Sequence, residues 1–169
     1  MVFKHIQFTR KKLLLSAVVC VVAATSITAI LFFTGSRQPL IPAEYSNSAS
    51  FEIFAPQPLP DDYILDVESL KYESATLLFT IYDTSGNKIN FSEQTIPAEF
   101  NFDSFYSAIL KDSRKLDNTP FASTQGTDSN GDKTLSIEAG KTWVVANAKA
   151  STSDKTLQQI AERLVAQSK

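Results

Sequence analysis

The chain has few of the side chains that carry most enzyme catalysis and metal binding. Its 169 residues include one histidine, His5, and one cysteine, Cys20, and both precede the part that we expect to fold. Without them the folded part has neither a Ser-His-Asp triad nor a zinc site with nitrogen or sulfur ligands. It also has no disulfide, which fits a bacterial exterior better than a eukaryotic secreted module.

Acidic residues are missing from the first 43 positions. All 18 of them lie at or after Glu44, together with 11 Lys and Arg, so this part of the chain carries a net charge of −7. Residues 1–12 instead hold four basic residues and no acidic one. Because an acidic domain repels phosphate backbones, we expect no nucleic acid among the partners.

Residues Leu13 to Phe33 form a long apolar run. Its 21 residues include no charged residue, no proline and no glycine. As a helix the run is about 31 Å long, which matches the roughly 30 Å hydrocarbon core of a bilayer. Four basic residues precede it and Arg37 follows it, which places the N-terminus in the cytoplasm. The sequence therefore predicts a single-pass cell-membrane protein that contacts the lipid bilayer through Leu13 to Phe33.

Two other interpretations of this run are less consistent with its sequence. A cleaved signal peptide has an apolar region of about 7–15 residues, and cleavage at Val22-Ala23-Ala24 would leave an apolar end on the mature protein. A lipoprotein needs a small residue before its cysteine, whereas Val19 precedes Cys20 in the middle of the run. We therefore expect a retained anchor, although the sequence leaves open whether the segment is ever cleaved.

Beyond the apolar run the composition changes twice. Residues 34–50 are rich in Ser, Pro and Asn, which predicts a linker. Residues 51–169 are rich in aromatic residues, which a disordered tail would lack, and they form the expected extracytoplasmic domain. The predicted organisation is a basic cytoplasmic stub (1–12), a transmembrane helix (13–33), a linker (34–50) and an α+β domain (51–169).

A hairpin is the clearest element of the expected domain. In residues 75–82 every second position is apolar, which places these apolar side chains on one face of a strand. Turn residues at 83–87 join this strand to another at 88–95, which predicts antiparallel pairing. The inward-facing residues expected in the hairpin are Leu77, Phe79, Ile81, Ile89 and Phe91.

Shorter alternating segments predict the rest of an antiparallel meander of roughly five to seven strands. One of them, residues 63–70, is expected to place Leu65 and Val67 on one face, with a turn at 71–74. The other expected strands are residues 51–55, 119–127, 133–138 and 142–148, with turns at 128–132 and 139–141.

Two segments have helical spacing. Residues 101–110 predict a short helix, followed by a solvated basic connection at Lys111, Arg114 and Lys115. A C-terminal amphipathic helix, capped by Thr152 or Ser153, is expected to pack on one face of the sheet and to complete an α+β fold. The expected apolar stripes are Phe102, Phe105, Tyr106 and Ile109 in the first helix, and Leu157, Ile160, Ala161, Leu164 and Val165 in the second.

Candidate chemical motifs are weak. Asp61, Asp62, Asp66 and Glu68 cluster in sequence, and paired acids can hydrolyse glycosides, but acids in a loop are usually just solvated. A Ser-Lys dyad stays open, although no serine is singled out. We therefore predict that the protein is not an enzyme and that it has no catalytic, cofactor-binding or metal-ligating residues and no cofactor.

Two further features have alternative interpretations. Asp128-x-Asn130-x-Asp132 resembles the start of a calcium loop, but Lys133 stands where that loop needs glycine. Because Asn130-Gly131 is a strong hairpin signal, we expect a turn there. Trp143, the single tryptophan, could anchor a ligand or partner, but its place in an apolar strand favours a core position.

The order of these features resembles a family of bacterial extracytoplasmic domains of unknown function. The motifs that carry the resemblance are an F-x-x-F-x-P-x-x-L-P-x-x-Y segment (51–63), Gln94-Thr95-Ile96-Pro97 after a hairpin, Trp143, and LQQIAERL (157–164). Members stand behind single membrane spans, some in regulators similar to anti-sigma factors. Such a regulator needs a folded cytoplasmic domain, whereas the stub here has twelve residues, and the resemblance brings no catalytic residue.

The sequence therefore favours a membrane-tethered, non-enzymatic extracytoplasmic domain of the bacterial cell envelope that binds a protein or another envelope component. One alternative is a sensory or regulatory subunit that signals through its single span. A second alternative is a small cell-wall hydrolase that uses carboxylates; it requires two acids about 5–9 Å apart across an open groove.

Overall fold

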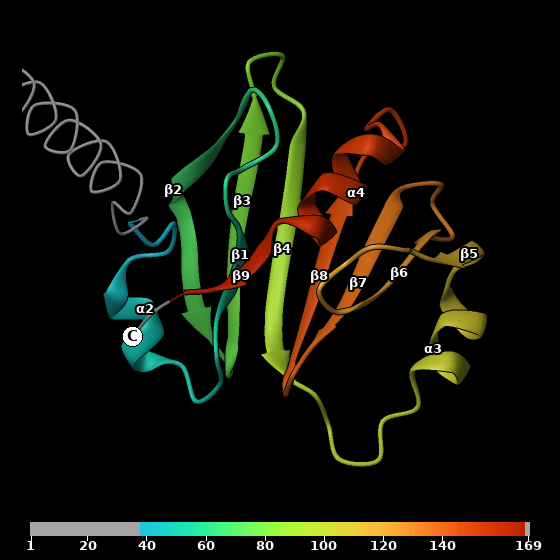
Figure 1. The fold of residues 1–169 in the computed structure, drawn as a ribbon, viewed down its shortest axis with the longest axis horizontal. Helices are drawn as coiled ribbons and strands as arrows, with labels where there is room; N and C mark the ends of the chain where they lie inside the picture. The colour runs from blue at the N-terminus through green and yellow to red at the C-terminus, as the bar shows by residue number, and fades with distance from the viewer. Residues whose placement is uncertain (1–37, 168–169) are drawn as a thin grey trace, which may run out of the picture. The chain divides into compact units, whose positions relative to one another are not determined.

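The computed structural model describes residues 38–167 and gives them an α+β fold with a large antiparallel sheet (Figure 1). The expected stub, the expected span Leu13 to Phe33 and the start of the expected linker lie outside these residues. Among the residues described, no helix is long and apolar enough to cross a membrane. The elements are α2 (Ala43–Ser48), β1 (Phe54–Pro56), β2 (Tyr63–Glu73), β3 (Thr76–Asp83), β4 (Lys88–Thr95), α3 (Phe102–Ile109), β5 (Lys111–Lys115), β6 (Ala122–Thr127), β7 (Lys133–Ala139), β8 (Thr142–Ala148), α4 (Asp154–Glu162) and β9 (Leu164–Ala166).

The main sheet has seven strands in the order β2-β3-β4-β8-β7-β6-β5, and all neighbours are antiparallel. Each half of this order is a meander, and the two meanders join where β4 pairs with β8. In that central pair Phe91 lies opposite Ala146. The predicted antiparallel meander is confirmed, and so is the hairpin that joins β3 to β4.

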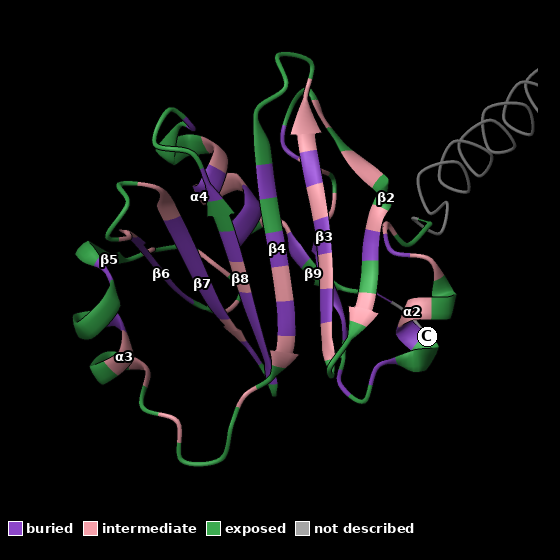
Figure 2. Ribbon diagram, turned by 180° about the vertical axis from the view of Figure 1, so that it is seen from behind, coloured by how far each residue is buried: buried purple, intermediate pink, exposed green. Residues whose placement is uncertain are grey.

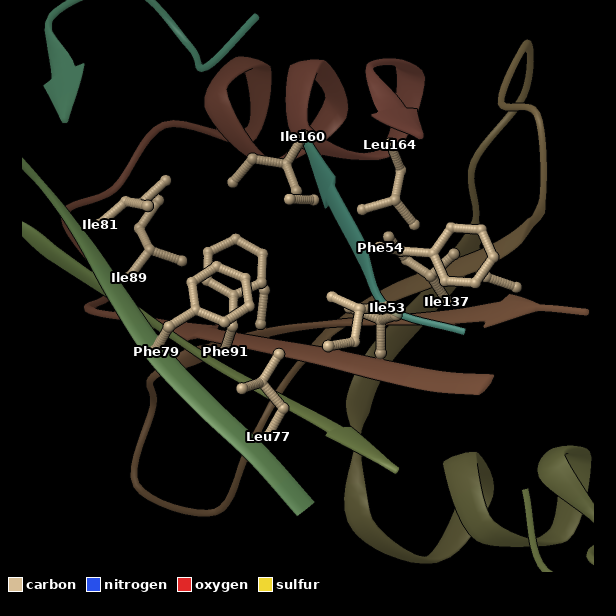
Figure 3. Packing of buried hydrophobic residues seen from close by; sticks show 14 of the residues in the cluster. Ile53, Phe54, Leu77, Phe79, Ile81, Ile89, Phe91, Ile137, Ile160 and Leu164 are labelled. Carbon is tan, nitrogen blue, oxygen red and sulfur yellow. The ribbon is translucent and has the colours of Figure 1, made fainter. Parts of the chain in front are cut away.

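One face of the sheet carries the core. The five inward-facing residues predicted for the hairpin are all buried, because every second side chain of β3 and β4 points to this face. The rings of Phe79 and Phe91 stack with their centroids 4.5 Å apart. In Figure 3, Ile160 and Leu164 approach these rings from the opposite side, with Phe54 beside Leu164.

A second layer covers this core face. It consists of α4 and a two-stranded sheet in which β1 pairs with β9, and both cross in front of the large sheet in Figure 1. The predicted cap is confirmed at Ser153, whose side chain accepts a hydrogen bond from the backbone N–H of Thr156 at 3.0 Å. Leu157, Ile160 and Ala161 are fully buried, as the stripe predicts.

The end of the C-terminal helix differs from the prediction. The helix stops at Glu162, and Leu164 and Val165 belong to β9. Leu164 is still buried, but Val165 is 37% exposed. The backbone groups of β1 explain the change, because they pair with β9 and the chain must become extended to reach them. Helical spacing alone could not reveal this partner strand.

The folded unit begins earlier than predicted. It starts at Pro39, within the expected linker, where Ile41 is fully buried and α2 follows. The side-chain Oε1 of Gln167 accepts hydrogen bonds from the N–H groups of Leu40 at 2.6 Å and Ile41 at 3.3 Å. The linker prediction is therefore wrong for this segment, because Gln167, which follows β9, holds it in place.

Three strand predictions need correction. Most of the turn expected at 71–74 is part of β2, which ends at Glu73, and the turn itself lies at Ser74 and Ala75. The register shift between Asp66 and Lys71 leaves Val67 63% exposed. The expected strand at 51–55 is the shorter β1. The expected basic connection at Lys111, Arg114 and Lys115 is the exposed edge strand β5, because it pairs with β6. Charged residues on such an edge disfavour pairing with another chain.

Candidate functional site

The second face of the large sheet is only partly covered. In Figure 2, which views the sheet from behind, α3 lies at one end of the sheet beside β5. Buried and less buried residues alternate along β3 and β4 in the same view. The residues that point to this second face include Ser92 and Gln94 on β4 and Val145 and Asn147 on β8, whose strand neighbours face the core.

Helix α3 is positioned by its N-terminal cap and by aromatic packing. The side chain of Asn101 accepts a hydrogen bond from the N–H of Ser104 at 2.8 Å. The indole of Trp143 packs against three rings from α3 and the loop before it, with centroid distances of 5.0 Å to Phe100, 5.5 Å to Phe102 and 5.0 Å to Phe105. Such aromatic pairs favour edge-to-face or tilted arrangements, as found here.

Gly126 lets the end of α3 approach the sheet. A Cβ at this position on β6 would lie 2.9 Å from the Cβ of Leu110, which is shorter than real carbon contacts allow. A hydrogen bond anchors the helix nearby, since the hydroxyl of Tyr106 lies 2.9 Å from Oγ of Ser136. Burial raises the pKa of Tyr106 to about 12, so its hydroxyl stays protonated at neutral pH.

A groove of about 540 Å³ lies between α3 and the sheet. Its helix side is apolar, since Phe105 and Ile109 stand one turn apart and Leu110 follows. Ile109, which the sequence placed on the buried stripe, is 43% exposed beside this groove. The sheet side is mostly polar and consists of Ser92, Gln94, Thr134, Ser136, Trp143, Val145 and Asn147.

Some polar groups of the groove are already engaged. Oγ of Ser136 accepts a hydrogen bond from Nε1 of Trp143 at 2.7 Å, and Thr134 Oγ1 donates to the side-chain oxygen of Asn147 at 2.9 Å. Among the residues described, nothing pairs with the side chains of Ser92 and Gln94 or with Nδ2 of Asn147. These hydroxyl and amide groups are available to a ligand.

Within residues 38–167, Asp128 is the single charged residue that lines the groove. Its Oδ1 accepts hydrogen bonds from the N–H groups of Asn130 at 2.8 Å and Asp132 at 3.0 Å. This geometry confirms the predicted hairpin turn. Among the residues described, no group of three or more His, Cys, Asp and Glu could hold a metal ion.

The four acids that the sequence singled out do not line the groove. Asp61 lies 3.9 Å from Arg163 near the start of β2, and Asp66 lies on β2 itself. The structure therefore does not bring these acids together across the groove. The prediction that Trp143 is buried is confirmed, but it packs beneath α3 rather than in the main core.

Glu93 is a buried acid that the sequence analysis did not single out. It is fully buried on the core face of β4, where Oε2 accepts a hydrogen bond from the N–H of Phe54 at 2.9 Å and Oε1 has no partner among the described residues. Burial raises its pKa to about 8. Glu93 continues the period of two set by Ile89 and Phe91, which was a signal that could have placed it in the core.

A second recess, of about 700 Å³, includes Phe51, Thr95 and Gln167. It lies among the segment before β1, the end of β4, the turn between β7 and β8, and the end of β9. Comparisons with known proteins add no further guide, since no family model, curated protein or solved structure matches the chain. The resemblance to extracytoplasmic domains behind single membrane spans stays a prediction.

Proposed function

We propose that this protein is a membrane-tethered, non-enzymatic domain of the bacterial envelope and that it binds an envelope component in the groove beneath α3. The observation that carries the proposal is the composition of that groove. An apolar helix side faces hydroxyl and amide groups that lack partners among the described residues. Binding sites for small ligands commonly combine an apolar lining with a few placed polar groups.

The membrane part of the proposal rests on the sequence. Leu13 to Phe33 has the length and composition of a transmembrane helix, and the basic residues before it favour a cytoplasmic N-terminus. In this arrangement the folded unit from Pro39 onward lies outside the cytoplasmic membrane. The groove would then face the periplasm or cell wall, where envelope polymers and proteins are its candidate ligands.

Protease accessibility tests this orientation. Protease added to spheroplasts should digest the domain of the full-length protein, whereas a cytoplasmic control protein stays intact. A domain that resists protease until the cells are lysed would refute the proposed orientation.

Photocrosslinking in the native membrane tests the binding site. A photoreactive amino acid replaces Ala108, an exposed residue at the groove, and in a matched control it replaces the exposed Lys155 on α4, across the sheet. We expect a reproducible adduct from position 108 and none from position 155. No adduct from position 108, or equal adducts from both positions, would count against binding in this groove.

A further inference from the structure

This inference rests on the proposed function, and it begins with the charge of the groove, which indicates the class of ligand. Among the described residues, its lining includes no Lys, Arg or His, and the one charged residue there is Asp128. An anionic ligand, such as a phosphate or a uronic acid, would therefore bring a negative charge to a site without a counter-charge. The groove suits a neutral ligand.

The polar side of the groove excludes a wholly apolar ligand. A lipid tail would cover Ser92, Gln94 and the free Nδ2 of Asn147 without forming a hydrogen bond to any of them. A buried donor or acceptor without a partner loses its hydrogen bonds to water and gains none in return. The ligand must therefore carry hydroxyl, amide or carbonyl groups along one side.

The backbone beneath the groove excludes an extended peptide that binds by strand addition. Strand β4 is already paired with β3 and β8, and β7 with β8 and β6, so their backbone N–H and C=O groups are in use. Strand addition needs a free sheet edge. The groove instead lies over the face of the sheet, where only side chains are available.

A pyranose ring is neutral and has both an apolar face and polar groups, as the groove requires. One of its faces presents C–H groups, and its rim presents several hydroxyls that both donate and accept hydrogen bonds. We infer that the groove binds a neutral saccharide, with a C–H face against Phe105 and Ile109 and with hydroxyls bonded to Gln94 and Asn147. The groove volume of about 540 Å³ is within the range of small-ligand sites and fits a short stretch of a glycan chain.

Tryptophan fluorescence can test this inference without a label. Trp143 is the single tryptophan of the chain and lines the groove. The full-length protein is prepared in lipid nanodiscs, which avoids detergents with sugar headgroups. Titrations use cellotetraose and tetra-N-acetylchitotetraose as neutral probes, tetragalacturonate as an anionic probe and n-hexane as an apolar probe.

We expect a saturable fluorescence change with at least one neutral probe and none with the other two. Gln94→Ala and Asn147→Ala should each weaken binding about tenfold, since each removes a hydrogen bond to the ligand. Phe105→Leu keeps the bulk of the side chain but removes its flat face, and it should also weaken binding. The matched control Gln159→Ala, on α4 across the sheet, should bind like the parent.

The inference falls if neither neutral probe binds, if the groove variants bind as well as the parent, or if the anionic or apolar probe binds more tightly. These outcomes can be distinguished from a failure of the proposed function by the photocrosslinking experiment. A photoadduct at position 108 that releases no sugar on acid hydrolysis would show a bound protein or lipid. Binding in the groove would then stand while the saccharide would be refuted.

Discussion

Replacing Glu93 by glutamine should change how the stability of the protein depends on pH. The carboxyl of Glu93 is buried, and burial raises its pKa from the ordinary 4.5 to about 8. Between these two values the folded protein keeps a proton that the unfolded chain has released. The free energy of unfolding therefore falls as pH rises, by about 1.4 kcal/mol for each pH unit.

The size of the effect follows from the two pKa values. Below pH 4.5 both states are protonated, and the contribution of Glu93 to stability is fully present. At pH 7 the loss amounts to about 3 kcal/mol, and it approaches about 5 kcal/mol near pH 8. Typical domains have about 5–15 kcal/mol of stability in total, so this one side chain matters.

Glutamine keeps an oxygen that can accept the hydrogen bond from the N–H of Phe54 but cannot titrate. At pH 4.5 we expect the free energy of unfolding of Glu93→Gln to be no higher than that of the parent. Between pH 4.5 and pH 7 the free energy of unfolding of the variant should rise by about 3 kcal/mol relative to the parent. Urea denaturation of the full-length protein, followed by the fluorescence of Trp143, gives both free energies across pH 4.5–8.5.

The comparison with a control variant makes the test specific. Glu73→Gln introduces the same chemical change at an exposed position on β2 and should give a curve parallel to that of the parent. A difference between Glu93→Gln and the parent that does not change with pH would refute the reasoning. A difference that shrinks with rising pH would refute it as well.

Three substitutions test the packing by urea denaturation. Ile160→Ala should lower the free energy of unfolding by about 2–5 kcal/mol, since Ile160 is fully buried beneath α4, and a loss below 1 kcal/mol would contradict that packing. Ser153→Ala removes the cap of α4 and should cost about 1 kcal/mol, whereas Ser151→Ala, at an exposed position outside the helix, should cost almost nothing. Gly126→Ala should cost about 1–3 kcal/mol, because its Cβ would lie 2.9 Å from the Cβ of Leu110. The additional change Leu110→Ala should not recover this loss, since alanine keeps that Cβ and the carbonyl oxygen of Lys111 lies 3.1 Å away. Unchanged stability would show that the helix end can shift freely.

The sequence predicts the large sheet well where apolar residues alternate. Leu77, Phe79 and Ile81 on β3 mark the buried face directly, and β4 has the expected bounds. The alternation fails at Val67, because the register shift in β2 moves its side chain outward. A pattern that repeats every two residues does not reveal a register shift between paired strands.

Long-range pairing explains the other differences. The pairing of β1 with β9 ends α4 early, and Gln167 fixes the segment around Ile41, so both features depend on residues far apart in the chain. The groove has the same origin. Gln94 and Asn147 lie on its sheet side because β4 pairs with β8, and no local motif could bring these residues together.

The pairing of β1 with β9 also bears on how the protein is made. Gln167 holds Leu40, 127 positions away, so this contact cannot form until Gln167 has left the ribosome. Until then the face of the sheet with Phe79 and Phe91 stays open to solvent and to other unfolded chains. Contacts between distant residues also slow folding. Synthesis therefore leaves this apolar face without its covering layer until β9 has emerged, which is the interval in which a growing chain is most exposed to aggregation.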